Sequence, residues 1–265
     1  MNATEKKMLE ILQNLRKTCN VVGVKAEFEA EGTRTEELLR LLEIARRADV
    51  KIALKIGGCE AVRDLIEAKQ FGVDYIIAPM VETPYALQKF IDAKNKVYNK
   101  EERADVDFLV NIETKTGFDH QQEFAKVASA PNGIQGLVFG RVDYVGSKGM
   151  PRDSVDDAVV TADVIQVAAS CKAHNLDLVV GGGVSINAAS SLAAMKKVHL
   201  TRFETRKIIF SSDALSSNAI QEGLLNAVHF ELLWLLNKRE FYSIITNEDD
   251  KRIEMLDARW KLLNK

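Results

Sequence analysis

Two hydrophobic patterns alternate along this chain almost from end to end. Short apolar runs of about four to eight residues, typical of buried strands, are separated by longer stretches with the spacing of amphipathic helices. Because strands that alternate with helices pair in parallel through right-handed crossovers, the pattern predicts an α/β fold with a parallel sheet. The strand runs lie near residues 20–27, 51–56, 74–79, 106–113, 135–140, 177–181 and 206–210.

The sheet is expected to close into a (β/α)₈ TIM barrel. Polar groups follow several of the strand runs at their carboxyl ends, where barrels of this kind hold their active sites. A closed barrel needs eight parallel strands and the pattern supplies seven, so the position of the eighth strand stays open. An open doubly wound sheet is the alternative, but no Gly-x-Gly-x-x-Gly motif follows the first strand run.

Amphipathic helices are expected at both ends of the chain. An extra N-terminal helix near residues 4–17 precedes the first strand, a long apolar helix near 218–237 ends the main body, and a further helix carries Trp260. We therefore expect one barrel domain over residues 1–238. A C-terminal helical extension over 239–265 would pack on the barrel or on a neighbouring subunit. These helices carry more apolar surface than one barrel buries, which predicts a homo-oligomer.

Charge and composition narrow the class of protein further. The net charge of -2 over 265 residues excludes a general nucleic-acid or anionic-membrane binder, because neither partner attracts a nearly neutral protein. No apolar run approaches the roughly 20 residues that span a bilayer, and the mixed charges of residues 1–8 do not resemble a secretion signal. The three cysteines lack metal-ligand spacing, so we expect a cytoplasmic protein.

Two carboxylates follow neighbouring strand runs. Glu113 closes the run that begins at Val106, Asp143 closes the next run, which begins at Gln135, and a turn follows each carboxylate. Since the carboxyl ends of parallel strands meet at one edge of the sheet, both side chains are expected to point into one pocket. Oxygen ligands of this kind suit a hard cation such as Mg²⁺ or Mn²⁺. The alternative is that each carboxylate caps a turn or pairs with Lys115 or Arg141.

Three motifs together resemble the HpcH/HpaI aldolase and citrate lyase β-subunit family over about residues 20–215. The resemblance implies a (β/α)₈ barrel that acts on pyruvate-like 2-oxo acids or acyl-thioester relatives at a divalent metal held by Glu113 and Asp143. It also implies an oligomer in which the terminal helix is exchanged between neighbours. The motifs are Pro79-Met80-Val81, Ile112-Glu113-Thr114, and Phe139-Gly140-x-x-Asp143 followed by Gly149.

The substrate-binding position departs from the family pattern. The family places an arginine at the end of a strand to bind the substrate carboxylate, and Lys55 stands at that position here. A lysine keeps the charge but loses the bidentate fork of a guanidinium. The backbone amides of Gly57 and Gly58 are expected to supply the missing donors. Gly140 and Arg141 are also assigned to substrate binding.

The general base of the family is missing as well. The aldolases carry a catalytic histidine directly after an acidic residue on the first matched strand, whereas here Glu27 is followed by Phe28. Glu27 is therefore our candidate for acid–base chemistry, with Lys55 as the second catalytic residue. Glu29 and Glu31 follow closely and stay as alternatives.

The sequence as a whole predicts a metal-dependent carbon–carbon lyase, an aldolase-like enzyme that acts on a 2-oxo acid or enolpyruvyl-type substrate through a metal-stabilised enolate. One alternative is a barrel isomerase or epimerase of a sugar phosphate, because the glycines at 181–183 precede a helix and such turns hold phosphate. Another is a non-catalytic descendant that binds a metabolite. A Schiff-base enzyme using Lys25 or Lys55 is a third.

Overall fold

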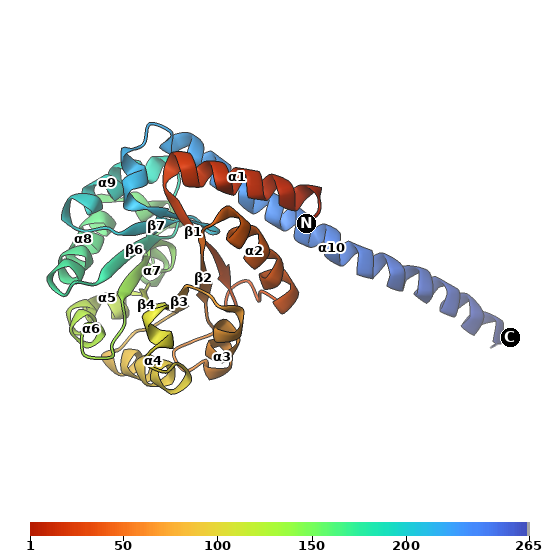
Figure 1. The fold of residues 1–265 in the computed structure, drawn as a ribbon, viewed down its shortest axis with the longest axis horizontal. Helices are drawn as coiled ribbons and strands as arrows, with labels where there is room; N and C mark the ends of the chain where they lie inside the picture. Colours follow the sequence, from red (N-terminus) through yellow and green to blue (C-terminus); the bar gives the residue numbers. More distant parts are fainter. Residues whose placement is uncertain (264–265) are drawn as a thin grey trace.

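The barrel is closed and carries its helices on the outside (Figure 1). The computed structural model describes residues 1–263, and eight strands in those residues pair in chain order. The prediction of a TIM-like barrel with an N-terminal helix and a C-terminal helical extension is confirmed. The strands are β1 (Val21–Glu27), β2 (Lys51–Lys55), β3 (Tyr75–Ala78), β4 (Asp107–Ile112), β5 (Gly136–Gly140), β6 (Asp177–Gly181), β7 (Arg202–Glu204) and β8 (Ile208–Ser211).

The last strand runs in the opposite direction to the others. Strands β1 to β7 pair in parallel, as the helical connections between most of them require. Strand β8 is antiparallel to both of its neighbours, β7 and β1. The expectation of an entirely parallel barrel is therefore wrong for β8. The physical reason is its connection: only Thr205, Arg206 and Lys207 separate β7 from β8, and so short a link permits a hairpin but not a parallel crossover.

The strand that the sequence pattern left unplaced is β7. It has three residues, and its one apolar side chain, Phe203, lies between Arg202 and Glu204. A pattern this short carries no recognisable period, so the hydrophobic pattern does not predict a strand here. The hairpin is closed by a hydrogen bond from Thr205 N to Ile208 O of 2.9 Å. Its turn lies at the carboxyl end of the barrel.

Ten α-helices lie among residues 1–263, most of them around the barrel, with short 3₁₀ turns between some elements. The helices are α1 (Ala3–Cys19), α2 (Thr35–Ala48), α3 (Val62–Phe71), α4 (Pro84–Val97), α5 (Lys115–Asp119), α6 (Gln121–Ala128), α7 (Arg141–Ser147), α8 (Ala158–Ala173), α9 (Ala189–Val198) and α10 (Ile220–Leu263). The 3₁₀ turns are η1 (Glu102–Ala104), η2 (Arg152–Asp156), η3 (Ile186–Ala188) and η4 (Ser212–Ser216).

The apolar core has two layers, separated by the wall of the barrel. The larger layer lies between the strands and the surrounding helices. The smaller one fills the inside of the barrel, and its members alternate along the strands with residues of the outer layer. Toward the carboxyl ends of the strands, the inward-facing positions change from apolar to charged. The inner apolar residues are Ala53, Tyr75, Ile77, Leu109, Val138, Val179 and Ile209.

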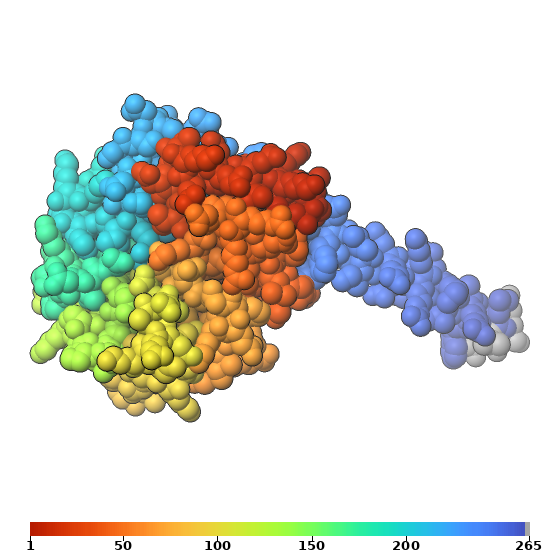
Figure 2. All heavy atoms as spheres, in the orientation of Figure 1, coloured from red at the N-terminus to blue at the C-terminus, as the bar shows by residue number. Residues whose placement is uncertain are grey.

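The terminal helix α10 is continuous and projects beyond the barrel (Figures 1 and 2). We expected two helices here, and the 44 residues of Ile220–Leu263 form one. Its first half packs along α1 and buries Trp234. No helix within residues 1–263 is both long and apolar enough to cross a membrane. Apolar side chains are exposed along the whole length of α10, including Leu225, Val228, Leu232, Leu235, Phe241, Ile244, Ile245, Ile253 and Leu256.

Candidate active site

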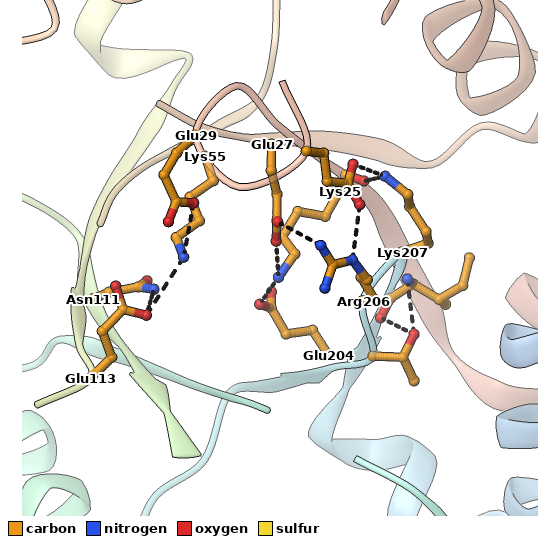
Figure 3. A network of polar contacts seen from close by, with 12 residues as sticks. Lys25, Glu27, Glu29, Lys55, Asn111, Glu113, Glu204, Arg206 and Lys207 are labelled. Atoms are coloured by element: carbon orange, nitrogen blue, oxygen red, sulfur yellow. Dashed lines mark hydrogen bonds and ion pairs between the residues drawn. The ribbon is translucent and has the colours of Figure 1, made fainter. Parts of the chain in front are cut away.

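Charged side chains from five segments meet at the carboxyl end of the barrel (Figure 3). This is the end at which barrels of this type perform their chemistry. The segments are the ends of β1, β2, β4 and β7 and the turn between β7 and β8. The residues are Lys25, Glu27, Glu29, Lys55, Asn111, Glu113, Glu204, Arg206 and Lys207, joined by Glu31.

Glu113 and Lys55 form the first part of this network. Glu113 is buried, and its Oε2 lies 3.5 Å from Lys55 Nζ. Asn111 Nδ2 donates a hydrogen bond of 2.6 Å to the same oxygen. Lys55 also lies 3.3 Å from Glu29 Oε2, so its amine stands between two carboxylates. The two strand-end residues that the sequence singled out for substrate and metal are therefore in contact.

The motif at residues 79–81, directly after the neighbouring strand β3, contacts Glu113. Met80 N donates a hydrogen bond of 2.8 Å to Glu113 Oε1. Met80 has a φ of 50°, in the left-handed region that non-glycine residues rarely adopt. Such a conformation costs on the order of 1 kcal/mol, which a hydrogen bond to a buried carboxylate offsets. The backbone of Met80 is thus held in the conformation that directs its N–H at Glu113.

Lys25 forms the second part of the network inside the barrel. It makes a close ion pair with Glu204 and lies 3.3 Å from Glu27 Oε1. Burial disfavours the charged amine, but the carboxylates of Glu204 and Glu27 outweigh it and raise the pKa of Lys25 above its usual range. An amine that keeps its proton is a poor nucleophile, which argues against Lys25 as a Schiff-base residue.

Glu27 is held as a carboxylate. Burial on its own would raise the pKa of Glu27, but the positive charges of Lys25, Lys55 and Arg206 outweigh burial and lower it. Because Lys55 contributes to this shift, Glu27 belongs to the same electrostatic group as the Lys55–Glu113 pair. An ionised carboxylate surrounded by cations can accept a proton when a substrate displaces one of them.

The hairpin turn contributes two further cations. Arg206 Nε donates a hydrogen bond of 3.1 Å to Glu31 Oε1, and Arg206 Nη2 lies 3.8 Å from Glu27 Oε2. Lys207 is buried and makes a close ion pair with Glu31. Burial lowers the pKa of Lys207 in spite of that carboxylate. Sequence reasoning did not assign Glu204 or Lys207 to the site, because it did not recognise β7 as a strand.

Two glycines make room for the buried glutamates. Gly140 and Gly181 are partners in the β5–β6 ladder and both occupy inward-facing positions at the strand ends. A Cβ atom at Gly140 would lie 2.8 Å from Glu113 Oε2, and one at Gly181 would lie 3.1 Å from Glu204 Oε1. A larger residue at either position would displace the neighbouring glutamate. Glycine at both positions therefore leaves the space inside the barrel that the two glutamate side chains occupy.

Two other predicted site residues, Arg141 and Gly57, make hydrogen bonds to neighbouring parts of the chain. Arg141 is fully buried, where its Nη1 donates a hydrogen bond of 2.6 Å to Asp156 Oδ1 and its Nε donates one of 3.3 Å to Gly181 O. Burial lowers the pKa of Arg141. Gly57 N donates a hydrogen bond of 2.7 Å to Asp64 Oδ2, and Gly58 lies in the same loop after β2.

Asp143 is placed differently from Glu113. Helix α7 begins directly after β5, so Asp143 stands in its first turn rather than at a strand end, and its side chain is exposed. Within residues 1–263, no hydrogen bond or ion pair connects it to Glu113 or to Lys55. The assignment of Asp143 as a metal ligand stays a prediction.

The glycines at 181–183 pack against their own chain. Gly182 and Gly183 have φ values of 79° and 67°. A Cβ at Gly182 would lie 2.6 Å from Val142 N, and one at Gly183 would lie 2.9 Å from Val155 Cγ2. These close approaches explain the glycines through the packing of the β6 turn on α7 and η2. They do not favour the phosphate-binding alternative.

The oxygen atoms of Glu113 and Asn111 could serve as ligands of a divalent cation that takes its other ligands from substrate and water. Asn111 Oδ1 is buried beside Glu113 and accepts no hydrogen bond from the described residues. Among residues 1–263, no three His, Cys, Asp or Glu side chains come together as a metal-binding group. Mg²⁺ suits such a site, because proteins commonly hold it by one or two carboxylates together with substrate and water.

The site carries a net negative charge, which favours the binding of a metal cation. In the described part of the network, the carboxylates exceed the cations by one, before the exposed Asp143 is included. The carboxylates belong to Glu27, Glu29, Glu31, Glu113 and Glu204, and the cations belong to Lys25, Lys55, Arg206 and Lys207.

The closed barrel, with a charged network at the carboxyl ends of its strands, has the architecture of a TIM barrel. The family model described as HpcH/HpaI aldolase/citrate lyase matches residues 34–197, which is more than half of the chain. The chain therefore belongs to the HpcH/HpaI aldolase/citrate lyase family, and the resemblance noted from its motifs is confirmed. No curated protein sequence matches it significantly.

Solved structures of the family share the fold. An HpcH/HpaI aldolase/citrate lyase family protein from Burkholderia cenocepacia J2315 aligns with a TM-score of 0.61 and 13% identity, covering 91% of this chain and 90% of that one. An HpcH/HpaI aldolase from Desulfitobacterium hafniense DCB-2 has a TM-score of 0.59 and 10% identity, with coverage of 74% and 82%. A citrate lyase from Burkholderia xenovorans LB400 has a TM-score of 0.56 and 16% identity, with coverage of 83% and 73%.

The contact between Gly140 and Glu113 gives a testable prediction. Gly140→Ala should lower the free energy of unfolding by about 1–3 kcal/mol, because the added methyl group overlaps the buried glutamate. Urea denaturation measures the change. Gly146→Ala is the matched control, since nothing lies within 4 Å of its Cβ position.

A double mutant identifies the cause of that loss. A Cβ at Gly140 would lie 2.8 Å from both the Cβ and the Oε2 of Glu113, so if this overlap is responsible, Gly140→Ala should cost much less in a Glu113→Gly background than in the wild type. Equal losses in the two backgrounds would contradict the proposed contact.

Proposed function

We propose that this protein is a divalent-metal-dependent carbon–carbon lyase, aldolase-like, that acts on a 2-oxo acid or enolpyruvyl-type substrate. The observation that supports this most directly is the contact of 3.5 Å between Lys55 Nζ and Glu113 Oε2 at the carboxyl end of the barrel. A cation for a substrate carboxylate and an oxygen ligand for a metal stand side by side there. Membership in a family of aldolases and lyases agrees with the proposal.

Lys55 is proposed to bind the carboxylate of the substrate. Its amine lies between Glu29 and Glu113 and has three donors. Glu29 is on the exposed side of this arrangement, so a substrate carboxylate can take its place at Lys55 while the Glu113 contact is kept. Gly57 N already donates to Asp64 Oδ2, so of the two glycine amides assigned to the substrate, that of Gly58 is the one we propose as a further donor.

Glu113, with Asp143 as the proposed second ligand, would hold Mg²⁺ or Mn²⁺. The metal, when bound, supplies Lewis-acid stabilisation of the negative charge that develops on the 2-oxo group as an enolate forms. Asn111 and Met80 fix the orientation of the Glu113 carboxylate through their hydrogen bonds.

Glu27 is proposed to move the proton. In the cleavage direction, a carboxylate oxygen of Glu27 accepts the proton of the substrate hydroxyl group. The adjacent carbon–carbon bond then breaks, and its electron pair enters the 2-oxo acid portion as the hydroxyl carbon becomes a carbonyl group. Lys25 stabilises the ionised form of Glu27 before the reaction. This role replaces the histidine that is absent at Phe28.

A cytoplasmic homo-oligomer is the proposed state of the protein. The cysteines Cys19, Cys59 and Cys171 are all free, as expected in a reducing compartment. Helix α10 exposes many apolar side chains in two groups, over residues 225–245 and 253–262, and a soluble monomer rarely tolerates so much exposed apolar surface. A second copy of the chain packed on α10 would bury that surface.

Metal binding tests the assignment of the ligands. Glu113→Gln and Asp143→Asn should each weaken the binding of Mn²⁺, measured by calorimetry with and without oxalate, by about tenfold or more. Chelation should abolish cleavage of 2-oxo acid substrates. Glu123→Gln on α6 is the control, because its exposed carboxylate lies outside the network. Unchanged Mn²⁺ affinity in both site variants would refute the metal site.

Lys55→Ala tests the carboxylate contact. Loss of a hydrogen bond between charged groups costs roughly 1.5–3 kcal/mol, so kcat/KM for the 2-oxo acid should fall about 10- to 150-fold. Lys51→Ala, at the exposed opposite end of the same strand, should leave kcat/KM unchanged. Trapping of a pyruvate adduct on Lys55 by borohydride would instead assign the Schiff-base role to this residue.

Removal of residues 239–265 tests the assembly. The truncated protein should associate more weakly in sedimentation experiments and lose activity with the assembly, because much of the exposed apolar surface of α10 lies in that segment. Leu232→Asp, on the retained part of α10, should weaken association in the same way. A full-length protein that sediments as a monomer at micromolar concentration would overturn the proposal.

A further inference from the structure

We propose that Arg206 binds a second negatively charged group of the substrate, a carboxylate or a phosphate, at the end remote from the 2-oxo acid. The proposal rests on the proposed function for the position of the 2-oxo acid itself. It assigns to the reversed hairpin of β7 and β8 a part in substrate selection.

The hairpin brings Arg206 to the correct end of the barrel. Because β8 returns antiparallel after three residues, the turn that carries Arg206 lies at the carboxyl end, above the charged network. Figure 3 shows Lys55 and Glu113 on one side of Glu27 and Arg206 on the other. A substrate held by Lys55 at one end would therefore extend past Glu27 toward the guanidinium.

Arg206 is the accessible cation of the site. Its side chain is 51% exposed, compared with 10% for Lys25 and for Lys55 and 2% for Lys207. Lys25 and Lys207 are enclosed by their own carboxylate partners, so a ligand entering from solvent meets Arg206 first. Among the cations of this network, Arg206 alone combines exposure with a planar guanidinium.

Most of the donors of Arg206 remain available. Its Nε donates to Glu31 Oε1 at 3.1 Å, whereas its Nη2 is 3.8 Å from Glu27 Oε2, too long for a hydrogen bond. Nη1 has no partner among residues 1–263. A guanidinium with free N–H groups on one edge matches the two oxygens of a carboxylate or phosphate.

When a ligand replaces Glu31 and Glu27 at Arg206, each of these two carboxylates still has another cation beside it. Glu31 keeps its ion pair with Lys207 when a ligand takes Arg206, and Glu27 keeps Lys25. Removal of one member of a buried ion pair is costly because the other charge stays uncompensated. Here both carboxylates have a second cation, so that cost is avoided. The substrate class that fits is a dicarboxylic or phosphorylated 2-oxo acid.

Two 2-oxo acids of equal length test the proposal. 2-Oxoglutarate and 2-oxovalerate have the same carbon chain, and they differ in a terminal carboxylate against a terminal methyl group. With Mg²⁺ present, the wild type should bind 2-oxoglutarate about tenfold or more tightly, as expected for one charge-assisted contact. Arg206→Gln should remove this preference while its affinity for 2-oxovalerate stays unchanged. Arg206→Lys should keep part of it.

Controls separate Arg206 from a general effect of charge. Arg47→Gln on α2, 59% exposed and paired with Glu43, should keep the full preference. 4-Phosphono-2-oxobutyrate replaces the terminal carboxylate by a phosphonate, so its affinity relative to 2-oxoglutarate shows which anion Arg206 selects. A preference that persists in Arg206→Gln, or a wild type that binds the two 2-oxo acids equally, would overturn the proposal.

A second measurement does not depend on the 2-oxo acid. The arginine Nε–H signal that is absent from Arg206→Gln identifies Arg206 by NMR, and inorganic phosphate should shift it. If phosphate shifts the signal while neither 2-oxo acid binds, the anion site stands and the proposed function falls. If phosphate leaves the signal in place, the anion site is refuted.

Discussion

The buried ion pair of Lys25 with Glu204 is the interaction on which the rest of the site depends. The two residues come from β1 and β7, and β8 runs between those strands, so the pair spans the place where the barrel closes. Glu204 lies over Gly181, and Lys25 in turn holds Glu27 as a carboxylate. Without Glu204, the amine of Lys25 would have only Glu27 to offset its burial.

Stability alone does not explain so many charges inside a barrel. A buried ion pair is often no better for stability than apolar side chains of the same volume, because the desolvation of two charges offsets their attraction. The lower layer of this barrel shows that an apolar filling is available to the fold, with Leu109, Val138 and Val179 in equivalent positions. The change from apolar to charged residues therefore marks the level at which the interior serves chemistry rather than packing.

The sequence predicted the parts of the molecule whose signals are local and long enough. Strands β1 to β6 have apolar runs between helices, and the polar residues that end β2 and β4 identified Lys55 and Glu113. Strand β7 could not be recognised, because three residues with one apolar side chain have no period, and Glu204 was lost with it. Asp143 was expected at a strand end, but α7 begins at Arg141 and moves it onto a helix. The sequence pattern predicted two helices at the C-terminal end, and the structure joins them into the single helix α10.

Because α10 is one continuous helix, the number of residues along it fixes both how far its end lies from the barrel and which way its side chains face. At about 1.5 Å per residue, its 44 residues extend for roughly 66 Å, longer than a typical domain is wide. Any surface that its far end contacts is set at a fixed spacing from the barrel. One inserted residue would move that end by only about 1.5 Å but rotate it by about 100°, turning its apolar side chains away from their partner. An insertion of seven residues would restore the direction and change the spacing by about 10 Å. The helix thus couples length to orientation, and tolerance to insertions along it should recur with the helical repeat.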